Sequence, residues 1–357
     1  MNSSDLLLEV KGLRTYFRTE EGIVKAVDGV DFVVPRGKTL CLVGESGCGK
    51  SVTAYSILQI VTPPGRIVEG EVLFHRRTNG GAGAAVETVN LAGLHPRGRE
   101  IRGIRGKEIA MIFQEPMTSL SSVYTIGRQI VEAIRIHLPV SKQEARERSI
   151  ELLQRVGIPR PKEQMGAYTF ELSGGMRQRV MIAMALSCNP SLLIADEPTT
   201  ALDVTTQAQI LDLMLELQEE YGMAIMFITH DLGVVAEIAD EVVVMYLGWV
   251  VERGDVDSIF HDPKHPYTQA LLRSIPKLKL KVHEQLDSIR GRVPSPFNRP
   301  TGCVFYPRCD DFRSGVCDRG IPPRVSLGET GREVRCLCHS SQSLSESAVA
   351  STEDGNG

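Results

Sequence analysis

The chain contains the stretch Gly44-Glu45-Ser46-Gly47-Cys48-Gly49-Lys50-Ser51, which fits the pattern G-x-x-x-x-G-K-[ST] of a phosphate-binding loop, or P-loop. An apolar run, Leu40 to Val43, precedes it and predicts a buried parallel strand. The residues from Ser51 to Leu58 can open a helix. Glycines let backbone N–H groups turn toward an anion, and a helix N-terminus adds partial positive charge. We therefore expect Lys50 to reach the β- and γ-phosphates of a nucleotide, and the Ser51 hydroxyl to ligate Mg²⁺.

The composition is that of an ordinary globular protein, with 357 residues of which 42% are hydrophobic and 24% charged. A net charge of −4 argues against a basic footprint for nucleic acid. No apolar run approaches the ~20 residues that a membrane-spanning helix needs. The first five residues lack the basic and apolar segments of a secretory signal. We expect a cytoplasmic protein, held at a membrane by other subunits if it acts there.

Two further apolar runs end in polar residues that suit nucleotide chemistry. The run from Leu192 ends in Asp196 and Glu197, and the run from Ala224 leads into His230. Parallel strands of this kind end at the nucleotide face of a sheet. An acid at such a strand end fits Mg²⁺ ligation by Asp196. Glu197 is then placed to orient or deprotonate an attacking water.

Ser173-Gly174-Gly175 precedes the apolar helical run Val180 to Leu186 and offers a second set of free N–H groups to an anion. Upstream, the segment from Leu6 to Phe17 and the segment from Val24 to Val34, which reads as a second strand pair, predict a small antiparallel layer. In that layer Phe17 or Tyr16 either stacks on an adenine ring or packs among the strands. The spacing of apolar residues predicts helices at 126–137 and 142–156.

Together these motifs resemble those of the ATP-binding cassette (ABC) ATPase family over about residues 6–260. The resemblance implies nucleotide contacts from Phe17, Gly44, Glu45, Ser46, Gly47, Cys48, Gly49, Lys50, Ser51, Val52, Gln114, Ser173, Gly174, Gly175, Gln178 and Asp203. It implies catalytic roles for Glu197, His230 and Lys50, and Mg²⁺ contacts for Ser51, Gln114 and Asp196. In this family two cassettes pair head to tail, so each ATP lies between the P-loop of one and the Ser-Gly-Gly turn of the other.

Flanking sequences resemble one branch of the family, the ATPases of oligopeptide/dipeptide (and nickel) importers. They are Met111 to Leu120, His265 to Thr268 and Gly302 to Cys309. Two features depart from the branch. Ser121-Ser122 stands where Asn-Pro is usual, and a second cysteine, Cys338, follows Cys336 near the end.

Five of the eight cysteines crowd the C-terminal region. Four thiolates suit either a tetrahedral zinc ion or an iron–sulfur cluster. The C-x2-C pairs of a zinc ribbon are absent. The resemblance implies a 4Fe–4S cluster on Cys303, Cys309, Cys317 and Cys336. Zinc, and free or oxidised thiols, are the alternatives.

The expected fold is α/β, with a P-loop ABC ATPase core, an antiparallel β-subdomain, an α-helical subdomain and a small cysteine-containing C-terminal extension. The expected domains are residues 1–260 for the ATPase, with its helical subdomain at about 115–190, and 261–340 for the extension. Residues 341–357 are rich in Ser, Glu and Gly, which predicts a disordered tail.

The resemblance implies a subunit that couples ATP and Mg²⁺ chemistry to uptake of di- or oligopeptides, peripheral at the cytoplasmic face of the inner membrane. The implied partners are a second ABC ATPase subunit, two permease subunits and an extracytoplasmic solute-binding protein, with no nucleic acid. One alternative is an importer of nickel or another small solute. A soluble ABC ATPase of DNA repair or translation is less favoured, because this chain has one cassette and a short helical insert. Glu197 argues against a non-hydrolysing partner subunit.

Overall fold

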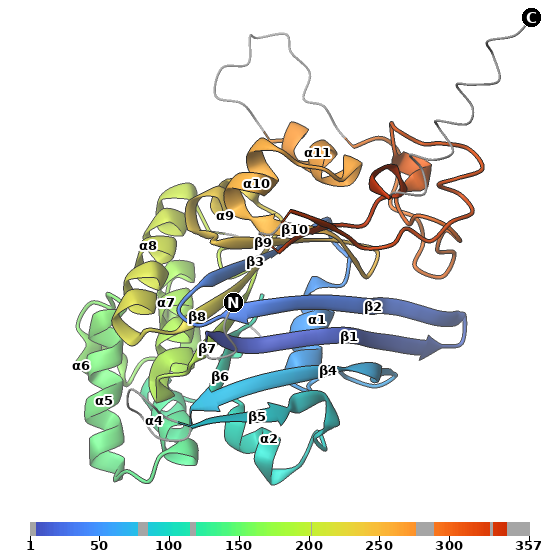
Figure 1. Ribbon diagram of the computed structural model, residues 1–357. Coiled ribbons are helices and arrows are strands. Elements are labelled where there is room, and N and C mark those ends of the chain that lie inside the picture. Colours follow the sequence, from blue (N-terminus) through green and yellow to red (C-terminus); the bar gives the residue numbers. More distant parts are fainter. Residues whose placement is uncertain are drawn as a thin grey trace, which may run out of the picture.

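The computed structural model describes residues 5–77, 85–114, 119–200, 202–275, 289–328 and 331–340. Figure 1 shows a central sheet with helices along one side, an antiparallel layer on the other and the C-terminal extension at one edge. No helix in these ranges is long and apolar enough to cross a membrane. The tail at 341–357, the loop residues 115–118 and Ala201 lie outside the described residues.

The antiparallel layer has four strands in the order β2-β1-β4-β5. Its strands are β1 (Leu6–Thr19), β2 (Gly22–Pro35), β4 (Gly65–Arg77) and β5 (Val86–Asn90). The segment that was expected to form a second strand pair is the single strand β2, which pairs along its length with β1. Burial alternates along β1 and β2, so one face of the layer packs on the core.

The central sheet has eight strands in the order β11-β12-β10-β9-β3-β8-β7-β6, and β9, β3, β8, β7 and β6 run parallel. Its strands are β3 (Thr39–Val43), β6 (Ile109–Ile112), β7 (Leu192–Asp196), β8 (Ala224–Thr229), β9 (Glu241–Tyr246), β10 (Trp249–Asp255), β11 (Val325–Leu327) and β12 (Arg332–Val334). The parallel order brings the carboxyl ends of β3, β7 and β8 to one edge, as their sequences predict.

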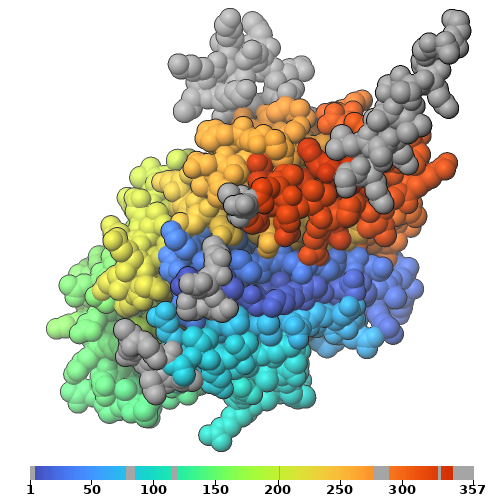
Figure 2. Space-filling view, in the orientation of Figure 1, coloured from blue at the N-terminus to red at the C-terminus, as the bar shows by residue number. Residues whose placement is uncertain are grey.

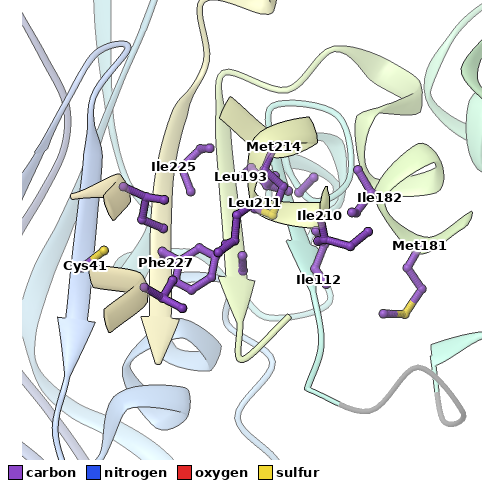
Figure 3. Close-up of a cluster of buried hydrophobic side chains, with 14 of the residues drawn as sticks. Cys41, Ile112, Met181, Ile182, Leu193, Ile210, Leu211, Met214, Ile225 and Phe227 are labelled. Atoms are coloured by element: carbon purple, nitrogen blue, oxygen red, sulfur yellow. The ribbon is translucent and has the colours of Figure 1, made fainter. Parts of the chain in front are cut away.

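Both faces of the central sheet are buried at the parallel strands β3, β7 and β8, which explains why these strands read as continuous apolar runs. Leu193 and Phe227 pack toward the helices, whereas Ile194 and Met226 pack toward the antiparallel layer. Figure 3 shows the helix side of this core, where strand residues meet Ile210 and other side chains of the covering helices. Successive residues of one strand therefore belong to different halves of the core.

The helices close the core and form the helical subdomain. They are α1 (Lys50–Ile57), α2 (Arg99–Ile104), α4 (Ile126–His137), α5 (Lys142–Arg155), α6 (Pro161–Gln164), α7 (Gly174–Ala185), α8 (Val204–Tyr221), α9 (Leu232–Ile238), α10 (Val256–His261) and α11 (Pro266–Arg273). The two helices predicted at 126–137 and 142–156 are confirmed as α4 and α5. Thr125 and Ser141 cap them by accepting backbone N–H groups of their first turns.

The C-terminal extension adds two strands to the central sheet. β12 pairs antiparallel with β10, and β11 pairs antiparallel with β12. Neither strand is predicted from the sequence, because each has three residues and no alternating pattern. In Figure 2 the extension, coloured orange to red, lies directly against the blue N-terminal strands. The central sheet thus continues from the ATPase core into the extension.

Candidate functional site

The P-loop joins β3 to α1, and its glycines are required by close packing. Gly44 has a φ of 146° and Gly49, the N-cap of α1, a φ of 104°. A Cβ atom on Gly44 would lie 2.2 Å from the Met245 carbonyl oxygen of β9. One on Gly49 would lie 2.2 Å from the Ala26 carbonyl oxygen of β2. Ser46 and Gly47 are exposed at the tip of the loop, Cys48 is buried, and Val52 is half-buried in α1.

Lys50 lies inside the loop and is only 5% exposed. Its ammonium group donates to the carbonyl oxygens of Gly44 at 2.7 Å and Glu45 at 3.2 Å. A buried charge is unfavourable unless it is hydrogen-bonded. These two carbonyls therefore keep the cation in the loop, beside the N-terminus of α1, where an anion would meet both.

Asp196, the last residue of β7, is fully buried and lies beside the start of α1. Its Oδ1 accepts a hydrogen bond from the Ser51 hydroxyl at 3.0 Å, and its Oδ2 has no hydrogen-bond partner among the residues that the structure describes. The pKa of Asp196 is raised to about 6, mainly by burial, with the Ser51 hydrogen bond opposing the rise and the nearby Glu197 adding to it. A buried carboxylate oxygen without a partner, next to a hydroxyl, fits a divalent cation that prefers oxygen ligands.

Glu197 follows Asp196 and has a backbone φ of 46°, which is uncommon for a residue with a side chain. Three polar side chains from three segments contact its carboxylate. Gln114 Nε2 and Thr200 Oγ1 donate to Oε2 at 2.9 Å and 3.1 Å, and His230 Nδ1 lies 3.1 Å from Oε1. The structure thus brings Gln114, Glu197 and His230 together at the edge where β6, β7 and β8 end.

Ser173 is the N-cap of α7, and its hydroxyl accepts the Met176 N–H at 3.3 Å. Ser173 and Gly174 are exposed, while Gln178, one turn further, is 2% exposed. In the described part of the chain, no hydrogen bond or ion pair joins 173–175 to the P-loop. Asp203 is the exposed N-cap of α8, where hydrogen bonds from Thr206 lower its pKa.

The two aromatic candidates of β1 differ in their surroundings. Tyr16 donates its hydroxyl proton to Asp28 Oδ1 at 2.6 Å, and burial raises its pKa to about 12. Phe17 is half-buried, and its ring covers Gly65, where a Cβ atom would lie 2.5 Å from the ring. Tyr16 is therefore engaged by its hydroxyl group, and Phe17 presents a partly exposed ring.

The eight cysteines are free thiols. Burial raises the pKa of Cys303, with a smaller contribution from Cys317, and it raises the pKa of Cys309 to about 12. In the described ranges no three His, Cys, Asp or Glu side chains are arranged to hold a metal ion. The predicted cluster on Cys303, Cys309, Cys317 and Cys336 therefore gains no support from the arrangement of these thiols.

Three contacts of the site were missed by sequence reasoning. One is Thr200, which lies three residues after Glu197 and donates a hydrogen bond to its carboxylate. The other two come from the C-terminal region, where the Tyr267 hydroxyl accepts the Glu45 N–H at 2.8 Å and Arg308 pairs with the Glu45 carboxylate at 2.6 Å. Tyr267 and Arg308 lie in stretches that the resemblance singled out, but no pattern linked them to a P-loop residue more than 200 positions away.

Comparison with known proteins agrees with this geometry. A family model described as ABC transporter matches residues 27–200, which include the P-loop, the Ser-Gly-Gly turn and the strand that ends at Asp196. A second model, described as the oligopeptide/dipeptide transporter C-terminal region, matches residues 251–317. The two models together therefore reach from β2 into the extension.

Relatives match over nearly the whole chain. The oligopeptide transport ATP-binding protein OppD of Bacillus subtilis is 51% identical over 93% of this chain and 89% of its own. The dipeptide transport ATP-binding protein DppD of Escherichia coli is 46% identical over 92% and 96%. A dimeric ATP-binding cassette solved in a post-hydrolysis state with ADP and Pi has a TM-score of 0.60 and 26% identity, and it covers 70% of this chain and 99% of its own. The chain therefore belongs to the ABC transporter ATPases, in the branch that carries the oligopeptide/dipeptide transporter C-terminal region.

Proposed function

We propose that this ABC ATPase drives the import of di- or oligopeptides. The observation that carries the proposal is the match of residues 251–317 to the oligopeptide/dipeptide transporter C-terminal region, in a chain whose near full-length relatives are named for oligopeptide and dipeptide transport. The ATPase core alone would fit any solute. The extension and the relatives are what favour peptides.

In the proposed reaction the protein positions groups around ATP and offsets charge, because phosphoryl transfer to water needs little covalent help. Lys50 would bind the β- and γ-phosphates in place of its two carbonyl partners. Ser51 and the free Oδ2 of Asp196 would hold Mg²⁺, with Gln114 completing the set. The metal would offset phosphate charge.

Glu197 would orient the attacking water and accept its proton. Its carboxylate is held by Thr200, Gln114 and His230, so its direction is fixed before the nucleotide arrives. His230 is 62% exposed in its side chain, and its ring can therefore turn toward a γ-phosphate. This arrangement supports general-base chemistry at Glu197.

A complete site requires a second cassette. Ser173, Gly174 and Gly175 would bind the ATP of a partner, since no hydrogen bond among the described residues joins them to their own P-loop, and Ser173 and Gly174 are exposed. Asp203 would lie at the same interface, beside Val204, whose 85% exposure is unusual for an apolar residue. ATP binding would then close the pair, and closure would move a membrane partner through the difference in affinity between open and closed states.

The permease would dock on the helical subdomain. A cavity of about 800 Å³ is lined by α4 and α5 residues, among them Val131 and Ile136. Ile136 is 69% exposed. An exposed apolar surface beside a cavity favours a protein partner. The subunit would sit peripherally at the cytoplasmic face of the membrane, with two permeases, a second ATPase subunit and an extracytoplasmic solute-binding protein completing the importer.

The test is transport by the assembled importer in proteoliposomes. With ATP inside, labelled di- or tripeptides should accumulate in the presence of the solute-binding protein, and peptide should raise the rate of phosphate release. Nickel uptake serves as the comparison. Stimulation by nickel and not by peptides would contradict the proposal, as would ATP hydrolysis without uptake of any peptide.

The iron–sulfur cluster on the tail cysteines stays a prediction, and no step of the ATPase depends on it. Four thiols in one short extension are the donor set that such a cluster needs. As arranged, they form no group ready to hold a metal in the described residues. Iron content and the visible spectrum of protein purified without oxygen test the prediction. A colourless sample without iron would contradict it.

A further inference from the structure

Glu45 is an acid inside a loop that binds anions. Its carboxylate is paired, because Arg308 of the C-terminal extension donates two hydrogen bonds to it. Arg308 NH1 donates to Oε2 at 2.6 Å and NH2 donates to Oε1 at 3.0 Å. Such a two-bond arrangement fixes direction as well as charge. The negative charge closest in sequence to the phosphate-binding glycines is thus offset by a residue 263 positions away.

Arg308 is itself held firmly. Its side chain is 3% exposed, Nε donates to the Arg290 carbonyl at 2.9 Å, and NH1 lies 3.3 Å from the Tyr246 hydroxyl. Its guanidinium lies over the rings of Tyr246 and Phe305, 5.8 Å and 6.0 Å from their centroids. A buried cation needs such partners. These contacts hold the Arg308 guanidinium toward Glu45.

The backbone of Glu45 is tied to the same region. Its N–H donates to the hydroxyl of Tyr267, which is fully buried against Tyr246 and Phe305 with ring centroids 4.7 Å and 5.2 Å away. The Glu45 carbonyl accepts from Lys50 at 3.2 Å. One P-loop residue thus connects the aromatic cluster of the C-terminal region to the lysine that would meet the phosphates.

We propose that Arg308 is a positioning residue for ATP, which neutralises Glu45 and holds the first turn of the P-loop, so that the C-terminal extension tunes the affinity for nucleotide. Without the guanidinium, the Glu45 carboxylate is an uncompensated negative charge beside the triphosphate and repels it. Removal of the guanidinium does not change the hydrolysis step at Glu197. The proposal rests on ATP hydrolysis by the family and not on which solute is imported.

The test compares four forms of the full chain, each assembled with its cognate subunits: wild type, R308Q, the double variant E45Q/R308Q, and R253Q as a matched control. R253Q removes an arginine from the Arg253–Glu333 pair, which joins β10 to β12 away from the P-loop. We expect R308Q to raise the KM for ATP roughly tenfold, within the usual range of coupling between sites, with kcat little changed. R253Q should leave both constants unchanged.

The double variant separates charge compensation from general support of the fold. Because E45Q removes the charge that Arg308 offsets, E45Q/R308Q should return the KM to within about twofold of wild type. A KM for R308Q within twofold of wild type, or a double variant no better than R308Q, would overturn the proposal. If R308Q does not fold, R308K gives the second test. It keeps the positive charge but loses the two-bond contact, so its KM should stay within about twofold of wild type, and a rise as large as the tenfold expected of R308Q would overturn charge compensation of Glu45 as the role of Arg308.

Discussion

At the scale of single residues, Glu197 carries the sharpest prediction. Glu197→Gln preserves the shape of the side chain but removes the group that can take a proton from water. We expect ATP binding to persist and phosphate release to fall by at least ~100-fold. Thr200→Val is the matched control, because it removes one hydrogen bond to Glu197 and leaves the base in place. Nucleotide titration and phosphate release measure both. Normal turnover by Glu197→Gln would remove this residue from its role.

Asp196 links the pH dependence of stability to the metal site. Its pKa in the folded chain is about 6, above the ordinary value of 3.8, because it is buried. The folded state therefore holds a proton that the unfolded state releases, and this residue costs stability as pH rises from about 4 to about 6. Asp196→Asn should raise the free energy of unfolding of the nucleotide-free protein by about 2 kcal/mol above pH 6, with the gain shrinking toward pH 4.

The same substitution should abolish Mg²⁺-dependent ATP binding, because an amide is a far weaker ligand for a hard cation. Denaturant unfolding at pH 4.5 and pH 7.5, with and without Mg-ATP, measures both effects. Asp196→Asn that is no more stable than wild type at pH 7.5 would contradict the assignment of a buried, unsatisfied charge to this position.

At the scale of elements, the P-loop is shaped by the strands that press on it. Gly49→Ala would place a Cβ atom 2.2 Å from a main-chain oxygen of β2, so the loop or the strand must move. We expect a loss of more than about 2 kcal/mol in the free energy of unfolding, together with loss of ATP binding. Gly37→Ala is the control, since Gly37 also has a positive φ, of 66°, but has open space around it. It should cost about 1 kcal/mol and leave ATP affinity unchanged.

Elements with a continuous pattern of apolar residues are predicted well from this sequence. The buried strands that lead into Gly44 and Asp196 have uniform apolar runs, because both faces of the sheet are covered. The helices α4 and α5 have clear spacing and capping residues. The three-residue strands β11 and β12 have neither, because their pairing depends on the edge that β10 offers. The strands that lead into the candidate nucleotide site are therefore predicted from sequence, whereas the strands that attach the extension are not.

At the scale of the whole molecule, contacts between distant segments determine how the extension is attached, which the sequence motifs do not predict. Arg299 of the extension pairs with Asp28 of β2 at 2.7 Å, and Arg308 pairs with Glu45. These pairs join the extension to the antiparallel layer and to the P-loop. No local pattern marks either arginine, since each acts through a partner more than 250 residues away. The P-loop motif marks the residues that we expect to bind phosphate, whereas the fold determines which distant residues hold the loop in shape.

In our proposal one molecule supplies only part of its ATP site, and a second cassette supplies the rest. The exposed Ser173 turn belongs, in our proposal, to the ATP of a second cassette. With Glu197→Gln and Mg-ATP, the chain should form a stable pair with itself or with its co-purified paralogue, visible as a doubled mass by light scattering. Adding Ser173→Glu should abolish the pair, because a carboxylate would face the γ-phosphate across the interface.

Ser141→Glu is the matched control for that experiment. Ser141 is also an exposed serine that caps a helix and accepts a backbone N–H, at 3.1 Å, but it lies at the start of α5 in the helical subdomain. Both substitutions remove a cap and cost about 1 kcal/mol or less in helix stability, so a general loss of folding affects both alike. The two substitutions therefore differ in their effect on pairing only if the Ser173 turn binds phosphate. Pairing that survives Ser173→Glu, or that is lost equally with Ser141→Glu, would mean that the Ser-Gly-Gly turn does not bind the nucleotide of a partner.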